Sequence, residues 1–257
     1  MLVKLIADVH GDLQAVLREA SSCDVLLVLG DLINVIDYEN AGGILADVYG
    51  SDAVRTFSEL RRTGRHDEAR AHLASLGQGR EEDMRAAFLR GIESAHRDFC
   101  SSLPDNVVLT FGNVDVPDLI RAHVPPHVRF VDGEVLDLDG TRFGFVGGGL
   151  PKVGIPGEVS LDDYAAKVDA LGRVDVLCSH VPPAIDDLVH DVRADLREPG
   201  SEALLSYIRT HQPSHVYFGH VHYPRVATTQ VGTSVLVNVG HHFRSTGCAL
   251  VHPVLPS

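Results

Sequence analysis

The sequence lacks the features of disulfide-stabilised, membrane-spanning and nucleic-acid-scaffolding proteins. Its four cysteines are scattered without a CxxC pair, which argues against a disulfide framework in a chain of 257 residues. No apolar stretch approaches the roughly 20 residues that cross a bilayer, so we expect no membrane contact. Acidic residues (35) outnumber basic ones (22), and the formal net charge of −13 argues against a nucleic-acid scaffold.

A secretory signal is not expected at the N-terminus either. Asp8 and His10 interrupt the first apolar run almost at once, and no small-residue cleavage site follows. Internal repeats and low-complexity tracts are also lacking. Because 44% of the residues are hydrophobic, the chain can build a sizeable core. We therefore expect a cytoplasmic protein with a single domain over residues 1–257.

What the sequence does contain is a series of short apolar runs, typical of buried strands. They cover residues 2–7, 25–29, 107–111, 142–146, 174–178, 215–218, 234–239 and 249–251. Helices are expected at 13–20, 160–171 and 201–210, the second with Ser160 and Asp163 as a capping pair. Strands separated by helices predict an α/β fold with a parallel or mixed sheet.

A long segment between Asp31 and Gly112 exceeds what a crossover helix requires. Residues 38–100 are helical and polar in character, so we expect a helical insertion that forms a candidate cap over the strand ends. Its arginines are expected on solvated helix faces, although a guanidinium also suits phosphate oxygens. They are Arg55, Arg61, Arg62, Arg65, Arg70, Arg80, Arg85, Arg90 and Arg97.

Metal-binding side chains gather where the apolar runs stop. The seven candidates are Asp8, His10, Asp31, Asn113, His180, His220 and His222. Because sites in layered α/β folds assemble at the C-terminal ends of strands, residues distant in sequence can converge there. Carboxylate, imidazole and amide groups suit divalent cations, and the Asp31 carboxylate can bridge two of them.

These segments resemble the calcineurin-like metallophosphoesterases. DVH, GD, GNVD, SH and GHVH match the family pattern D-x-H, G-D, G-N-H-[D/E], H and G-H-x-H from Asp8 to His222. The resemblance implies a four-layer α/β-β-α sandwich with a dinuclear centre at the strand ends. It also implies two ligand sets that share Asp31 as a bridge. One set is Asp8, His10, Asp31 and His222; the other is Asp31, Asn113, His180 and His220.

The resemblance further implies a phosphohydrolase whose metal-bridging hydroxide attacks phosphorus. Two divalent ions (manganese, iron or zinc) and a small phosphorylated substrate are expected. The D-x-H-G start and the segment 237–240 resemble the smaller bacterial and archaeal phosphodiesterase branch. We therefore favour a phosphodiesterase or a small-metabolite phosphatase. The candidate catalytic residues are Asp31, Asn113, Asp115 and His241.

Val114 departs from the family pattern, which has a histidine there that binds phosphate and protonates the leaving group. Val114 cannot donate a proton, so either the leaving group needs little acid help or another donor replaces it. Asp115 has no histidine to orient here, so we expect its carboxylate to contact the metal ligands rather than the metal. The candidate donors are His241 and His242, with His123 and His127 as weaker ones.

Two other functions stay open on the sequence. A metallo-amidohydrolase also uses histidines and carboxylates, although the Gly-Asp and Gly-Asn strand ends and the amide ligand disfavour it. The histidine missing at Val114 could also mark a catalytically weak metal-binding scaffold or interaction module. Every ligand position is nevertheless filled, which favours the enzyme.

Overall fold

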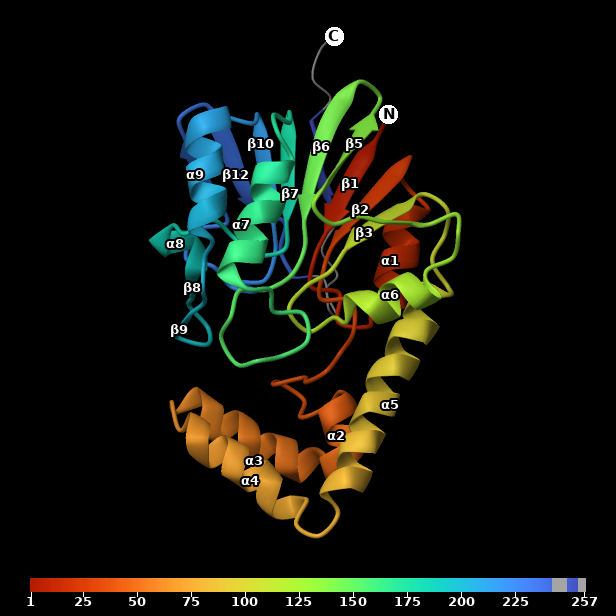
Figure 1. The fold of residues 1–257 in the computed structure, drawn as a ribbon, viewed down its shortest axis with the longest axis vertical. Helices are drawn as coiled ribbons and strands as arrows, with labels where there is room; N and C mark the ends of the chain where they lie inside the picture. The colour runs from red at the N-terminus through yellow and green to blue at the C-terminus, as the bar shows by residue number, and fades with distance from the viewer. Residues whose placement is uncertain (242–248, 254–257) are drawn as a thin grey trace.

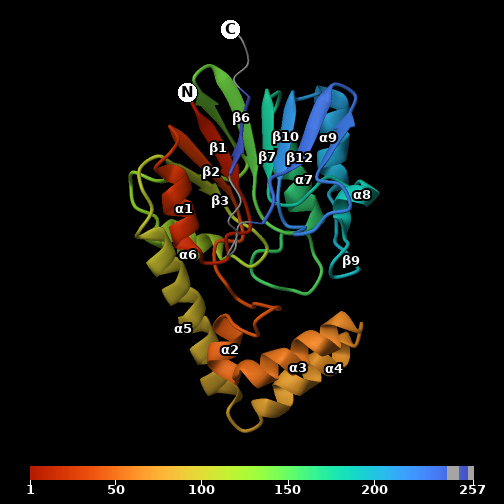
Figure 2. The same ribbon diagram turned by 180° about the vertical axis from the view of Figure 1, so that it is seen from behind.

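The computed structural model describes residues 1–241 and 249–253, and its strands form two stacked sheets (Figures 1 and 2). The strands are β1 (Val3–Ile6), β2 (Val25–Leu29), β3 (Val107–Thr110), β4 (Arg129–Phe130), β5 (Glu134–Leu138), β6 (Thr141–Val146), β7 (Val176–Ser179), β8 (His190–Asp191), β9 (Leu196–Arg197), β10 (His215–Phe218), β11 (Thr228–Val231), β12 (Ser234–Asn238) and β13 (Leu250–Val251). One sheet has the order β13-β1-β2-β3-β4 and the other β11-β12-β10-β7-β6-β5, while β8 and β9 form a separate hairpin. The central strands of each sheet run parallel, so their C-terminal ends share one edge.

Helices cover the outer face of each sheet and complete the four-layer α/β-β-α sandwich. They are α1 (Leu13–Ala20), α2 (Ile44–Tyr49), α3 (Ser51–Arg62), α4 (His66–Leu76), α5 (Glu81–Cys100), α6 (Pro117–His123), α7 (Leu161–Ala170), α8 (Asp186–Val189) and α9 (Glu202–His211). α1, α6 and the end of α5 pack on the first sheet, and α7 and α9 on the second. In the described ranges, no helix has the length and apolar character needed to traverse a bilayer.

Side chains from one face of each central strand fill the space between the two sheets. Leu5 and Leu27 from the first sheet meet Phe145 and Tyr217 from the second in a buried cluster. Ile6 lies on the opposite face of β1 and packs under the helices instead. Because both faces of these strands are buried, their sequences read as continuous apolar runs.

The expected strands and helices are confirmed, with ends shifted by at most two residues. β5 was not expected, nor were β4, β8, β9 and β11; in β5 Asp137 interrupts the apolar residues, so they form no continuous run. The signal that could have found β5 is the Asp139-Gly140 pair between β5 and β6. Both residues have left-handed backbone angles (φ 56° and 81°), as tight hairpin turns require.

Residues 38–100 contain α2–α5, which lie beyond the C-terminal ends of the strands (orange to yellow in Figure 1). Several arginines of this segment pair with acids three residues away on exposed helix faces, for example Arg62 with Glu59 and Arg65 with Glu68. Such exposed pairs contribute little to stability. Their position fits the solvated role expected for them, and the cap role of the insertion stays a prediction.

Candidate metal centre

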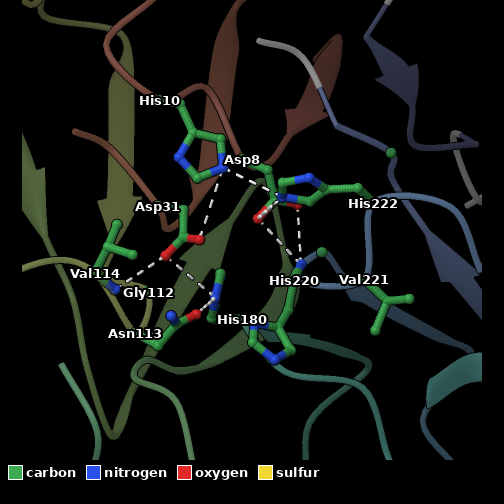
Figure 3. A network of polar contacts seen from close by, with 12 residues as sticks. Asp8, His10, Asp31, Gly112, Asn113, Val114, His180, His220, Val221 and His222 are labelled. Carbon is green, nitrogen blue, oxygen red and sulfur yellow. Dashed lines mark hydrogen bonds and ion pairs between the residues drawn. The ribbon is translucent and has the colours of Figure 1, made fainter. Parts of the chain in front are cut away.

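The seven predicted ligands come together where the C-terminal edges of the two sheets meet (Figure 3). β1, β2 and β3 deliver the first four, and β7 and β10 deliver the three histidines of the second sheet. Figure 3 shows these side chains pointing toward one another. Asp8 and His180 are fully buried and Asp31 nearly so, which is costly for polar groups without partners.

The backbone at the ligands is unusual. Asp8, His10, Asp31 and His220 all have left-handed backbone angles, with φ of 53°, 41°, 52° and 67°. Non-glycine residues adopt this region only where the surrounding structure enforces it, and such residues cluster at functional sites. Here the enforcement includes backbone hydrogen bonds from Asp8 N to Gly30 O (3.1 Å) and from His10 N to Asp31 O (2.9 Å). The backbone conformation at the strand ends therefore fixes the direction in which these side chains point.

Glycines next to the ligands allow the close packing of the strand ends. A Cβ atom at Gly112 would overlap Asp31 Oδ1 and lie 2.7 Å from His180 Cε1. A Cβ atom at Gly219 would lie 2.5 Å from Asp8 Oδ2. The Gly-Asn and Gly-His pairs of the sequence thus place a residue without a side chain against a ligand.

One group of four ligands is tightly gathered. Asp8, His10, Asp31 and His222 each offer a ligand atom, and these atoms lie within 4.8 Å of one another. His10 Nε2 lies 3.2 Å from His222 Nε2 and 3.8 Å from Asp31 Oδ2. The group is the same as the first ligand set implied by the resemblance.

The second set lies on the other side of Asp31. His180 Nε2 is 3.0 Å from Asn113 Oδ1 and 3.4 Å from Asp31 Oδ1. The His220 ring packs edge-on against the His180 ring, with centroids 5.1 Å apart. Asp31 therefore directs Oδ2 toward the first set and Oδ1 toward the second, as a bridging carboxylate would.

The hydrogen-bond pattern fits a cation in the second set. His180 Nδ1 donates to the Leu29 carbonyl at 2.9 Å, which leaves a lone pair on Nε2. That lone pair faces Asn113 Oδ1, another acceptor, at 3.0 Å. Two acceptors this close repel each other unless a cation lies against both. Imidazole, carboxylate and amide donors together suit manganese, iron or zinc.

The electrostatics of the cluster also favour bound cations. Burial, and then the neighbouring Asp31, raise the pKa of Asp8 well above its usual value. Burial also acts to raise the pKa of Asp31, but His180, His10 and His220 outweigh it and lower that pKa. Burial lowers the pKa of His180 to about 4, so its imidazole is neutral and able to bind a metal. In the described part of the chain, the ion-pair partners of Asp8 and Asp31 are all histidines, and divalent ions would compensate this buried negative charge.

Asp115, a catalytic candidate from the sequence, bonds to the turns that carry the predicted ligands. Its fully buried carboxylate accepts hydrogen bonds from Leu32 N (2.9 Å) and Gly112 N (2.7 Å). Burial, and then the nearby Asp31, raise its pKa to about 7. Because Leu32 and Gly112 adjoin Asp31 and Asn113, Asp115 ties two ligand-bearing turns together. This geometry suits a residue that positions the ligands, and a catalytic role for Asp115 stays a prediction.

His241 lies beside the first ligand set. It follows β12, and its ring stacks on the His222 ring with centroids 4.1 Å apart and an interplanar angle of 7°. The ring of His10 is 6.1 Å away. The structure thus brings one of the candidate proton donors next to the predicted metal ligands.

Val114, at the position of the missing family histidine, lies beside Asp31. Val114 donates its backbone N–H to Asp31 Oδ1 at 3.3 Å, while its side chain packs against the core under the helices. His127 contacts the Leu103 carbonyl, and His123 ends α6. His242 lies outside the described residues.

Three residues near the cluster were not found by sequence analysis. His96, fully buried in α5, lies 3.8 Å from Asp115 Oδ1 and so joins the insertion to the site. Glu198 lies 3.5 Å from His220 Nε2 and 2.6 Å from Lys152 Nζ. Each is a single residue of a common type in a helix or loop, so no spacing distinguishes it in the sequence.

Comparison with known proteins gives a family. The family model described as calcineurin-like phosphoesterase matches residues 1–224. No curated protein matches the chain.

Two solved structures resemble the fold. A hypothetical protein from Thermus thermophilus is 14% identical with a TM-score of 0.43, and the match covers 94% of this chain and 77% of that one. A putative 5'-nucleotidase from Staphylococcus aureus, in complex with alpha-ketoglutarate, is 11% identical with a TM-score of 0.45. That match covers 100% of this chain but 54% of the nucleotidase, so this chain spans about half of its length. Both TM-scores are below 0.5, and neither structure bears on the activity.

Proposed function

This chain belongs to the calcineurin-like phosphoesterase family, and we propose that it is a dinuclear phosphohydrolase acting on phosphodiesters or on small phosphorylated metabolites. The observation that carries the proposal is the convergence of six predicted ligands around a seventh, Asp31, whose two carboxylate oxygens face different ligand sets. Family membership supports phosphoester hydrolysis. The strained backbone at four of the ligands supports a site built for function rather than for stability.

The roles of the protein groups follow from their positions. When bound, two divalent ions would supply an activated water nucleophile and neutralise the phosphoryl oxygens. Asp31 would hold both ions, and the Val114 N–H that it accepts fixes the direction of Oδ1. Asn113 would add a neutral oxygen ligand. His180 is held in one tautomer by the Leu29 carbonyl and so keeps Nε2 directed into the site.

We favour a phosphodiester because of the D-x-H-G start and the segment 237–240, and the missing family acid constrains the leaving group. Val114 offers no acid at the family's usual position, so the leaving group is either a weak base or is protonated from elsewhere. His241 is the described histidine best placed for this role, because it stacks on the ligand His222. We therefore assign His241 to the leaving-group side of the site.

A substrate panel tests the function. We expect the protein supplied with Mn²⁺ to hydrolyse bis-p-nitrophenyl phosphate faster than p-nitrophenyl phosphate, and to cleave at least one cyclic or linear nucleotide diester. His180→Ala is the matched inactive control, because it removes one ligand of the second set. Turnover by the wild-type protein no faster than by His180→Ala in Mn²⁺, Fe²⁺ and Zn²⁺ would leave the metal-binding scaffold as the better interpretation. Faster hydrolysis of the monoester would favour a small-metabolite phosphatase.

The role of His241 is tested by varying the leaving group. We expect His241→Ala to lower kcat/KM about 10²-fold on esters of poorly acidic alcohols and much less on p-nitrophenyl esters, because general acid catalysis helps poor leaving groups most. The measurement is a series of aryl and alkyl phosphodiesters with graded leaving-group pKa. An equal loss across the series would argue against proton donation by His241.

A further inference from the structure

A carboxylate outside the ligand set touches one of the ligands. Glu198 Oε2 lies 3.5 Å from His220 Nε2, and the same oxygen lies 2.6 Å from Lys152 Nζ. The side chains of Glu198 and His220 are 16% and 12% exposed, so solvent screens this contact only in part. The side chain of Lys152 is 29% exposed, more than those of Glu198 and His220.

The contact matters because it distinguishes the two ring nitrogens of His220. A histidine that binds a metal through one nitrogen usually donates the N–H of the other to a carboxylate or carbonyl, which fixes the tautomer and the ring direction. In His180 that partner is the Leu29 carbonyl at Nδ1, and Nε2 faces the site. In His220 the partner is Glu198 at Nε2, which leaves Nδ1 for the site.

We propose that Glu198 is a positioning residue that accepts the Nε2–H of His220 and so presents Nδ1 to the second ion. This role rests on the dinuclear centre of the proposed function. The two histidines of the second set would then bind through opposite nitrogens, His180 through Nε2 and His220 through Nδ1. Lys152 holds the Glu198 carboxylate in place and balances its charge.

The chain around Glu198 is held firmly enough for this role. Glu198 follows β9, and its backbone N–H donates to the Val189 carbonyl at 2.8 Å. A Cβ atom at Gly200 would lie 2.8 Å from Ala184 Cα, so the next turn is packed directly on the segment after His180.

That turn is also bonded to the loop that presents His180. Ser201 N donates to Pro182 O at 2.9 Å, and Ala184 N donates to Ser201 O at 3.1 Å. Because Pro182 lies two residues after His180, one scaffold carries both the ligand His180 and the orienting Glu198. The hairpin of β8 and β9, which lies between β7 and α9 in the chain, leads directly into the turn that carries Glu198.

Titration of the full-length protein with Mn²⁺ tests the proposal by calorimetry. Loss of such an orienting partner typically lowers metal affinity about 10–100-fold. We expect wild-type protein to bind two ions, and Glu198→Ala to bind one ion normally and the other about 10–100-fold more weakly. Glu198→Gln keeps a carbonyl acceptor and should lose less. The control is Glu202→Ala, which removes the same charge from an exposed position at the start of α9 and should bind both ions like wild type.

A second measurement reports on the histidine itself. In zinc-loaded protein, ¹⁵N NMR of the imidazole is expected to show His220 protonated at Nε2, with that signal shifted in Glu198→Gln, which also serves if Glu198→Ala does not fold. Two unweakened ions in the Glu198 variants, or His220 protonated at Nδ1, would overturn the role of Glu198 while leaving the phosphohydrolase intact. Fewer than two ions in wild-type protein would overturn the dinuclear centre and this role together.

Discussion

Asp31→Asn is expected to lose phosphoesterase activity by about 10³-fold or more, because metal ions contribute several kcal/mol of transition-state stabilisation and each 1.36 kcal/mol is a factor of ten. Asn keeps the shape of the side chain and can still accept the Val114 N–H, so the fold should persist. What it cannot do is offer two anionic oxygens to two ligand sets. The measurement is kcat/KM on a phosphodiester with Mn²⁺, with Asp118→Asn on the exposed side of α6 as the control.

Stability without metal distinguishes a functional Asp31 from a structural one. Asp31 raises the pKa of both Asp8 and Asp115, which shows that the three buried carboxylates repel one another. Asp31→Asn relieves this repulsion but also loses the attraction of His180, His10 and His220 that lowers the pKa of Asp31, so its thermal midpoint in EDTA should stay close to that of wild type. Metal at 100 times its Kd stabilises a single site by about 2.7 kcal/mol, and this gain should be lost in the variant. A large fall of the midpoint in EDTA would argue that Asp31 is structural.

Gly112→Ala is expected to disrupt the site without changing any ligand. The added methyl group would overlap Asp31 Oδ1 and crowd His180 Cε1, so the carboxylate must turn or β3 must move. Overpacking of this kind costs about 1–3 kcal/mol. We expect a lower thermal midpoint, and Mn²⁺ binding weakened by about 10²-fold or more, since metal ligands tolerate only small displacements. Calorimetry and thermal melts measure the two effects.

Gly77→Ala provides the matched control for this change. Gly77 has a right-handed backbone at the end of α4, and a Cβ atom there would lie 3.5 Å from Met84 Sδ, an ordinary contact. This variant should bind metal like wild type and change little in stability. Normal metal content and activity in Gly112→Ala would mean that the strand ends can separate freely, contrary to the packing described above.

The sequence predicted which side chains the fold brings together, because two strong signals coincide at the strand ends, and their role as metal ligands stays a prediction. Continuous apolar runs mark strands buried on both faces, and parallel strands bring their C-terminal ends to one edge. The position of a ligand-type residue directly after such a run therefore predicts that it lies at the shared edge of the sheet. The same reasoning missed β5, in which charged residues interrupt the apolar run. For Asp115 only the structure shows that both carboxylate oxygens are engaged by backbone N–H groups.

What the sequence by itself determined is the chemical inventory, namely carboxylates, histidines and an amide at five strand ends, with valine where the family has an acid. Only the tertiary structure decided which atoms face each other. The division of the Asp31 oxygens, the left-handed backbone at the ligands and the contact of Glu198 with His220 all depend on long-range packing. Residue type fixes what a side chain can bind, but its direction is set by neighbours that are far away in the chain.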